Sequence, residues 1–527
     1  MALGTASVQE RFENPRALLG DRLRGIYRLL ADYGEAIFPH DYFADCYKDS
    51  ARGRPTVPAR VLATVMVLQA HEGLSDGEAC DRLERDLAWQ AAAGVHVGYA
   101  AFHSTVLVGM RNRLRASARR RRLFEDTRAV AVESGLMGNR VRVVDSTPVY
   151  DAVATQDTVT QLRSAIRKLL RALHQDHPDL ETRVRAALKR NDDYAGPGKP
   201  PCDWDDAEAK DALVDALVVD ALAALGAIEG EVLSRPAAEA AELLALVAGQ
   251  DVDRGDDGMF RIARRVAPDR TISTVDPEAR HGHKSHDRRF DGYKAHLSID
   301  PDSELIDEVV VTPANAHDAT AIFDLLAPLA DEEAKPTVMG DSAYASAGTL
   351  DDLEQAGFAD ILAKVPPARG RQGRFGKDDF DVDLGDATVT CPAAKVAPIR
   401  YSPDGAGRAD FGGACSICPF RERCTISASG RSVSIHAKEA VLQRHKAAQA
   451  DPAWRAEYRS TRPKVERKIA HFVRVAWGGR KARTRGKARV ATDVDTRAAA
   501  VNWARLATLG LGVVDGRWMV APPVTSD

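Results

Sequence analysis

Residues 140–148, with the sequence RVRVVDSTP, open the part of the chain that decides the fold. Valine alternates with arginine and then runs apolar up to Asp145, which predicts a β-strand with a carboxylate at its carboxyl end. A second stretch, TVMGDSAYAS (residues 337–346), repeats this arrangement at Asp341. Folds of the α/β class place ligands at the carboxyl ends of strands, so both aspartates are candidate site residues. The alternative for each is a turn or helix cap.

Outward from these two strands, the pattern alternates between strand and helix. Further strands are expected at residues 292–299, 306–312 and 360–365, with a helix near 319–329. Such alternation is typical of an α/β sheet. The segment between the first strand and residue 265 is Ala-rich and helical in pattern, which indicates a helical insertion.

A third carboxylate, Glu466, lies in a basic amphipathic segment, YRSTRPKVERKIAHFVR (residues 458–474). Pro463 predicts that a helix begins there, which would place Glu466 near the helix N-terminus. The alternative role for Glu466 is a surface ion pair with Arg462. Three carboxylates are the ligand chemistry of hard divalent cations such as Mg²⁺, and two such ions can stabilise the attacking and leaving oxygens of a phosphodiester.

The order of the motifs VVDST, GDSAY and RPKVE resembles that of the DDE transposases of bacterial insertion sequences, in the subgroup with a helical N-terminal domain and a cysteine-bearing insertion. The resemblance spans residues 38–509. It implies an RNase H-like, mixed-sheet α/β catalytic core in which Asp145, Asp341 and Glu466 bind Mg²⁺ or Mn²⁺. It also implies an enzyme that cleaves DNA and transfers strands. His317-Asp318 matches a family motif after the third strand, with an expected structural or supporting role.

The family pattern Y-x2-R-x3-E-x6-K is matched at Arg462 and Glu466, whereas Tyr458 lies one residue early and Arg474 one residue late. Between Arg455 and Arg489 there are 13 Lys or Arg residues and two acidic residues, although the net charge of the chain is −3. Such a basic segment suits phosphates, and so do four adjacent arginines further upstream. The expected DNA-binding residues are Arg119, Arg120, Arg121, Arg122, Arg462, Arg474, Arg480, Lys481, Arg483 and Arg485.

Four of the seven cysteines cluster late in the chain, at Cys391, Cys415, Cys418 and Cys424. A C-x2-C pair with two further cysteines predicts a structural Zn²⁺ site, and reduced cysteines without metal are the alternative. No secretory signal or membrane-spanning run is evident, so we expect a cytoplasmic, nucleoid-associated protein that works on transposon ends and target DNA. Because two ends must be brought together, a homodimer is expected.

The expected organisation has a helical N-terminal DNA-binding domain, in which residues 60–72 and 76–91 form either a helix-turn-helix or part of a bundle. The expected boundaries are 1–130 for this domain, 138–160 and 285–368 for the core, 161–270 for the helical insertion, 370–435 for the zinc-ribbon-like insertion and 450–515 for the catalytic helix and the end of the core. Two other functions remain open: an RNase H-like nuclease that does not join DNA, and a catalytically inactive DNA-binding protein derived from a transposase.

Overall fold

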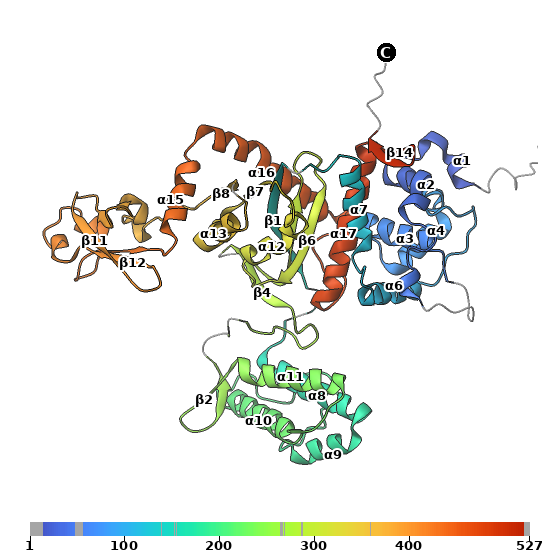
Figure 1. Ribbon diagram of the computed structural model, residues 1–527. Helices are drawn as coiled ribbons and strands as arrows, with labels where there is room; N and C mark the ends of the chain where they lie inside the picture. The colour runs from blue at the N-terminus through green and yellow to red at the C-terminus, as the bar shows by residue number, and fades with distance from the viewer. Residues whose placement is uncertain are drawn as a thin grey trace, which may run out of the picture.

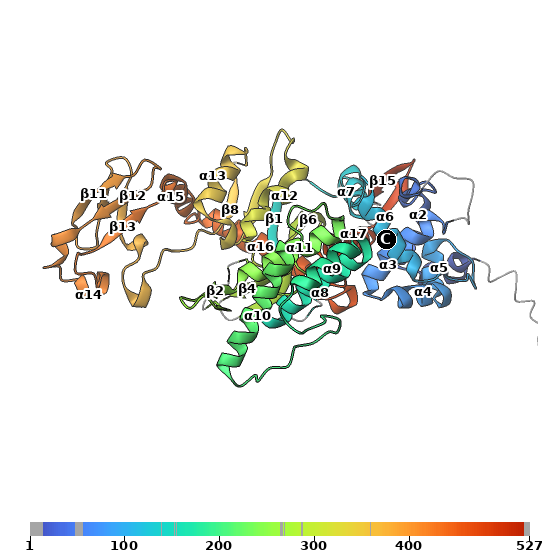
Figure 2. The same cartoon turned by 90° about the horizontal axis from the view of Figure 1, so that it is seen from below.

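The structure is a computed structural model, and it describes residues 14–47, 56–138, 140–151, 153, 155–263, 267, 269–285, 288–358 and 360–520. A mixed sheet lies at the centre, between a helical domain on one side and a small β-rich unit on the other, with a helical unit attached below the sheet (Figure 1). Seen from below, the helical unit lies in front of the sheet region (Figure 2).

The central sheet has the strand order β6-β5-β1-β7-β8, and β4 extends it along the first half of β5. Strand β1 is antiparallel to β5 and parallel to β7, which is parallel to β8. This order and these directions are those of an RNase H-like core. The strands are β1 (Val141–Tyr150), β4 (Arg280–Ser285), β5 (Arg288–Ile299), β6 (Ile306–Pro313), β7 (Thr337–Gly340) and β8 (Ile361–Ala363).

Strand β1 does not end at Asp145, as the sequence predicted, but continues to Tyr150. The ladder with β5 runs on from Asp145, opposite Leu297, to Tyr150. On its other side, β1 pairs with β7 only as far as Val143. From Val144 to Val149, β1 therefore has no neighbouring strand on this side among the described residues, and this edge tolerates Pro148, which has no N–H to donate.

Successive side chains of β1 face opposite sides of the sheet. Val143 belongs to a core that the sheet shares with the N-terminal domain, whereas Val144 packs in a second core on the opposite side. Asp145 has the parity of Val143 and lies on the first side, and Ser146 lies on the second. The second core includes residues of α12 (Ile322–Leu326), α13 (Ala347–Gln355) and α15 (Glu439–Ala448).

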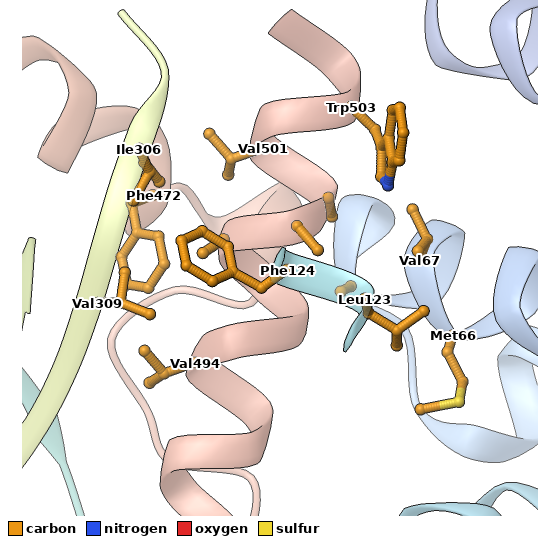
Figure 3. Packing of buried hydrophobic residues seen from close by; sticks show 14 of the residues in the cluster. Met66, Val67, Leu123, Phe124, Ile306, Val309, Phe472, Val494, Val501 and Trp503 are labelled. Carbon is orange, nitrogen blue, oxygen red and sulfur yellow. The ribbon is translucent and has the colours of Figure 1, made fainter. Parts of the chain in front are cut away.

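The N-terminal helices share one core with the central sheet. Figure 3 shows Val67 of α3 beside Trp503 of α17 (Lys487–Thr508), Met66 of α3 on the side of Leu123 of α7, and Phe124 of α7 on the side of Val494 of α17. The boundary expected at residue 130 falls inside α7, and the interface it would expose is apolar. The helices are α1 (Pro15–Leu19), α2 (Gly25–Ile37), α3 (Ala59–Glu72), α4 (Asp76–Arg85), α5 (Leu87–Ala93), α6 (Thr105–Ala116) and α7 (Arg122–Glu133).

The helix expected at 76–91 is divided at Asp86, whose side chain accepts the N–H groups of Ala88 and Trp89 and so begins a new helix. The four adjacent arginines, residues 119–122, follow α6, which ends at Ala116, and the last of them begins α7. The turn between α3 and α4 lies at residues 73–75, between the two predicted helices, with Gly73 in the left-handed conformation (φ 73°).

Gly73 also contacts the segment that follows the catalytic helix. A Cβ at this position would lie 2.9 Å from the backbone nitrogen of Gly478, whereas a Cβ at Gly98, which has a similar φ of 76°, would meet open space. We expect Gly73→Ala to lower the free energy of unfolding by about 2–4 kcal/mol and Gly98→Ala by about 1 kcal/mol, because only the first adds a clash to the strain of positive φ. Equal losses in urea denaturation would contradict this contact.

The two inserted units have cores of their own. In the first, Asp220 is buried and accepts a hydrogen bond from Tyr194 at 2.6 Å. The first unit consists of α8 (Thr158–Asp176), α9 (Pro178–Ala187), α10 (Ala207–Gly226), α11 (Arg235–Gln250), β2 (Val252–Arg254) and β3 (Phe260–Ile262). The second consists of β9 (Asp381–Asp383), β10 (Thr388–Thr390), β11 (Val396–Tyr401), β12 (Gly407–Asp410), α14 (Arg421–Cys424) and β13 (Ser432–Ile435).

Helix α16, which carries Glu466, runs from Pro452 to Phe472, so it begins well before the expected start at Pro463. Asp451 caps it by accepting the N–H of Ala453, and Pro452 occupies the first turn. After α17, a hairpin of β14 (Leu511–Val514) and β15 (Arg517–Val520) closes the described chain. Among the described residues, no helix combines the length and the apolar composition needed to cross a membrane.

Candidate active site

Asp145 lies at the free edge of β1, where α16 packs against the sheet. Its Oδ2 accepts a hydrogen bond from Nη2 of Arg462 at 2.8 Å, and its Oδ1 accepts the N–H of Ser146. The side chain is only 16% exposed. The strand therefore fixes one carboxylate against one helix, in a site that is partly shielded from water.

Asp341 directly follows β7 and caps the 3₁₀ turn η5 (Ser342–Tyr344) by accepting the N–H of Ala343 at 2.8 Å. Burial raises the pKa of the Asp341 carboxyl above its ordinary value. The charges of Asp145 and Asp318 raise this pKa further, although Ala343 and Arg462 oppose the rise. Negative charge at this point is thus incompletely compensated.

Glu466 lies on the exposed side of α16, with 65% of its side chain accessible. Its Oε1 is 3.9 Å from Nη1 of Arg462, one helical turn earlier. Because α16 begins at Pro452, Glu466 lies in the interior of the helix and lacks the N-terminal dipole that the sequence suggested. Arg462 is the residue that links Glu466 to Asp145.

Arg462 is the common neighbour of the three predicted carboxylates. Its side chain is 9% exposed. Burial lowers the pKa of its guanidinium, but Asp145 outweighs this effect and leaves the pKa above its ordinary value. Nη1 of Arg462 is buried and has no hydrogen-bond partner among the described residues. This guanidinium therefore has donor capacity left for an anion.

Several groups around the site were not identified as site residues from the sequence. Asp318, expected to be structural or supporting, accepts hydrogen bonds from Ser146 at 2.6 Å and from Lys294 at 2.7 Å. Tyr458 donates to the carbonyl of Gly340 at 3.2 Å and so ties α16 to the end of β7. The only sequence signal for Lys294 was its place in the strand FDGYKAHLSID.

The four upstream arginines have different surroundings. Arg119 pairs with Asp126, and Arg120 is exposed. Arg121 pairs with Glu308 and Asp495, which belong to the core, and Arg122 is buried against Asp45. The guanidinium groups of Arg121 and Arg122 are therefore engaged within the protein, and neither offers the free charge expected of a phosphate-binding residue.

The basic segment after α16 is attached to the strand that carries Asp145. The N–H of Tyr150 donates to the carbonyl of Arg480, and the N–H of Ala482 donates to the carbonyl of Tyr150. Arg474, Lys481, Arg483 and Arg485 are exposed, and Arg480 is half-buried. Arg480 and Lys481 thus lie at the far end of β1, and Arg483 and Arg485 follow them in the chain.

The four late cysteines line one cavity in the second inserted unit. Burial raises the pKa of the Cys424 thiol, opposed by Arg431 and reinforced by the other three cysteines. The sulfurs of Cys391 and Cys415 accept the backbone N–H groups of Lys395 and Arg431, each at 3.4 Å. The shared cavity places the four thiols in one neighbourhood.

In the part of the chain that the structure describes, no group of three or more His, Cys, Asp or Glu residues has the arrangement needed to hold a metal ion. The carboxylates nevertheless fit a divalent cation in chemistry: Asp145, Asp341 and Asp318 are hard oxygen donors whose mutual repulsion is felt at Asp341. Asp145 and Asp341 meet at the site, whereas Glu466 faces outward.

Comparison with known families agrees with this architecture. The model of the transposase DDE domain matches residues 262–503, which include Asp341 and Glu466, and the model of a transposase domain (DUF772) matches residues 12–113. Together the matches cover more than half of the chain, and Asp145 lies between them. Searches of curated proteins and of solved structures gave no match. The chain belongs to the DDE transposases of insertion sequences.

Proposed function

We propose that this transposase cleaves a phosphodiester at each transposon end to expose a 3′-hydroxyl, and then joins that hydroxyl to target DNA. Asp145, Asp341 and Glu466 would hold Mg²⁺ or Mn²⁺. The observation that carries the proposal is Arg462, whose guanidinium borders Asp145 and Glu466 and interacts with Asp341. Arg462 is thus a neighbour that a strand, a turn and a helix distant in sequence have in common, although the Glu466 side chain faces outward.

Bound divalent cations would supply the stabilisation of the attacking and leaving oxygens. The side chains of the protein would do the rest. Arg462 would bind a phosphate oxygen through its free Nη1, since guanidinium groups suit phosphate geometry. Lys294 and Ser146 hold Asp318 beside β1, and Tyr458 holds α16 to β7. These contacts would keep the carboxylates in register while DNA binds.

The proposed DNA surface contains Arg119, Arg120, Arg462, Arg474, Arg480, Lys481, Arg483 and Arg485. It omits Arg121 and Arg122, whose charges are neutralised inside the protein. Contacts of this kind supply affinity without sequence information. Recognition of the ends is assigned to the N-terminal domain, and a homodimer would bring two ends together at the nucleoid.

A structural Zn²⁺ is proposed for Cys391, Cys415, Cys418 and Cys424, because the four thiols line one cavity. We expect one zinc per chain in metal analysis of protein prepared without chelator. Cys418→Ser should lower that content, whereas Cys202→Ser, in the helical insertion, should not. Zinc-free wild-type protein, with an intact fold by circular dichroism, would contradict the proposal.

The test of function uses the full-length protein with donor DNA that carries the sequences flanking its gene and a supercoiled target plasmid. We expect donor strands joined to the target in the presence of Mg²⁺. Cleaved donor without joined product would favour an RNase H-like nuclease, and binding without cleavage would favour an inactive derivative. Either result would reject the proposed joining activity.

A further inference from the structure

A cleft of about 860 Å³ separates the N-terminal domain from the segment that follows the catalytic helix. We call it the interdomain cleft. The turn between α3 and α4 and one face of α6 form one wall, and residues 483–496 form the other. Its charged lining residues are three acidic residues bound to neighbouring groups, Arg111, which pairs with one of them, and three arginines without an ion-pair partner among the described residues.

The acidic residues of the cleft are engaged locally. Asp76 forms an ion pair with Arg111 at 2.7 Å, and Asp493 pairs with Arg497 at 3.1 Å. Glu78 accepts the backbone N–H of Ser75 at 2.7 Å in the capping box of α4. The charges of Asp76 and Asp493 are thus largely neutralised by arginines, and the Glu78 carboxylate is hydrogen-bonded to the start of α4.

The remaining arginines of the cleft are Arg115, Arg483 and Arg489. None of the three has an ion-pair partner among the described residues, and Arg483 donates only to the carbonyl of Leu74. Burial lowers the pKa of Arg115, and the charges of Arg489 and Arg111 lower it further. The charge of Arg483 also lowers the pKa values of Asp76 and Glu78. Positive charges from two domains nevertheless lie in one hollow, and a bound anion would relieve the repulsion that Arg115 meets from Arg489 and Arg111.

The cleft is also continuous with the active site along the chain. Residues 480–482 are hydrogen-bonded to Tyr150, at the end of the strand that carries Asp145. Five residues of extended strand span roughly 17 Å. Arg483, which follows directly, begins the wall of the cleft. A DNA strand bound at Asp145 and along residues 480–482 would therefore extend into the interdomain cleft.

We propose that the interdomain cleft binds the phosphodiester backbone of duplex DNA through Arg115, Arg483 and Arg489. This inference rests on the proposed function, because it concerns the same DNA substrate. In this site, α6 of the N-terminal domain and the start of α17 would bind the same DNA duplex from two sides. The affinity is independent of sequence, because arginine contacts with phosphates read no bases.

The test measures the affinity of full-length Arg115→Gln/Arg489→Gln protein for a 30-base-pair duplex of arbitrary sequence, at several salt concentrations. Each lost phosphate contact reduces the salt slope by about 0.9, so we expect a slope shallower by about 2 and binding at least about tenfold weaker. The control Arg400→Gln/Arg517→Gln removes the same charge from exposed positions outside the cleft and should leave the slope within about 0.5 of wild type.

An unchanged slope in the cleft variant would overturn the proposal, and so would a change in oligomeric state with unchanged DNA binding, which would assign the cleft to contacts between copies. Circular dichroism checks that both double variants are folded. The outcome is separate from that of the proposed function. Wild-type protein that binds DNA but never joins strands would reject the function, and the slope would still decide the cleft.

Discussion

Asp145→Asn, Asp341→Asn and Glu466→Gln should each reduce DNA cleavage and strand transfer by at least about 100-fold while DNA binding persists. Each change keeps the shape of the side chain but removes the charge that a divalent cation needs. A metal ion contributes several kcal/mol of transition-state stabilisation, and each 1.36 kcal/mol corresponds to a factor of ten in rate. Gel assays of cleaved and joined products measure the effect.

Glu457→Gln provides the matched control, because Glu457 is an exposed glutamate on the same helix. Its activity should stay near that of wild type. If Glu457→Gln were inactive and Glu466→Gln active, the third carboxylate would be Glu457. Asp145→Asn also weakens the partner of a buried arginine, so its thermal unfolding should be compared with that of wild type before its activity is interpreted.

Asp307→Ala should lower the free energy of unfolding by about 3–5 kcal/mol. Asp307 is fully buried on β6 and accepts hydrogen bonds from Arg142 on β1 and Arg128 on α7, both at 2.7 Å. Its loss would leave two guanidinium groups without this partner at the junction of the N-terminal domain and the sheet. The cost of an uncompensated buried charge exceeds that of a lost surface pair.

Asp302→Ala is the control for this effect. Asp302 pairs with Arg140 at 3.3 Å, but both side chains are more than half exposed, so its loss should change stability by about 1 kcal/mol or less. Equilibrium denaturation in urea measures both variants. Similar values for Asp302→Ala and Asp307→Ala would contradict the structural role assigned to Asp307.

The local sequence pattern predicted the structure correctly where the boundary of an element depends only on residues close in sequence. Gly340 and Asp341 end β7 as predicted, and the α3–α4 turn falls at Gly73. Asp145 was identified correctly as a strand residue, but the end of β1 was not. Pro148 looked like a terminator, and its place at a free edge depends on which strand pairs beside it.

Tertiary partners explain the other differences. Pro463 resembles a helix start, yet α16 begins at Pro452 and contains Pro463 in its interior. A proline inside a helix is unfavourable by itself, so tertiary packing must stabilise the helix at this point. Arg121 and Arg122 look like part of a free basic run, but Glu308, Asp495 and Asp45 come from distant segments of the chain. Asp318 reaches the site through Lys294 and Ser146, contacts that no local pattern encodes.

The most direct test of the central claim measures Mn²⁺ binding by the electron paramagnetic resonance of free Mn²⁺, with full-length protein, duplex DNA and saturating zinc. Wild-type protein should bind Mn²⁺, and each of the three amide variants should bind it at least about tenfold more weakly, whereas Glu457→Gln should match wild type. Equal Mn²⁺ affinity in wild type and all three amide variants would contradict the assignment of Asp145, Asp341 and Glu466 as the ligands of the catalytic metal.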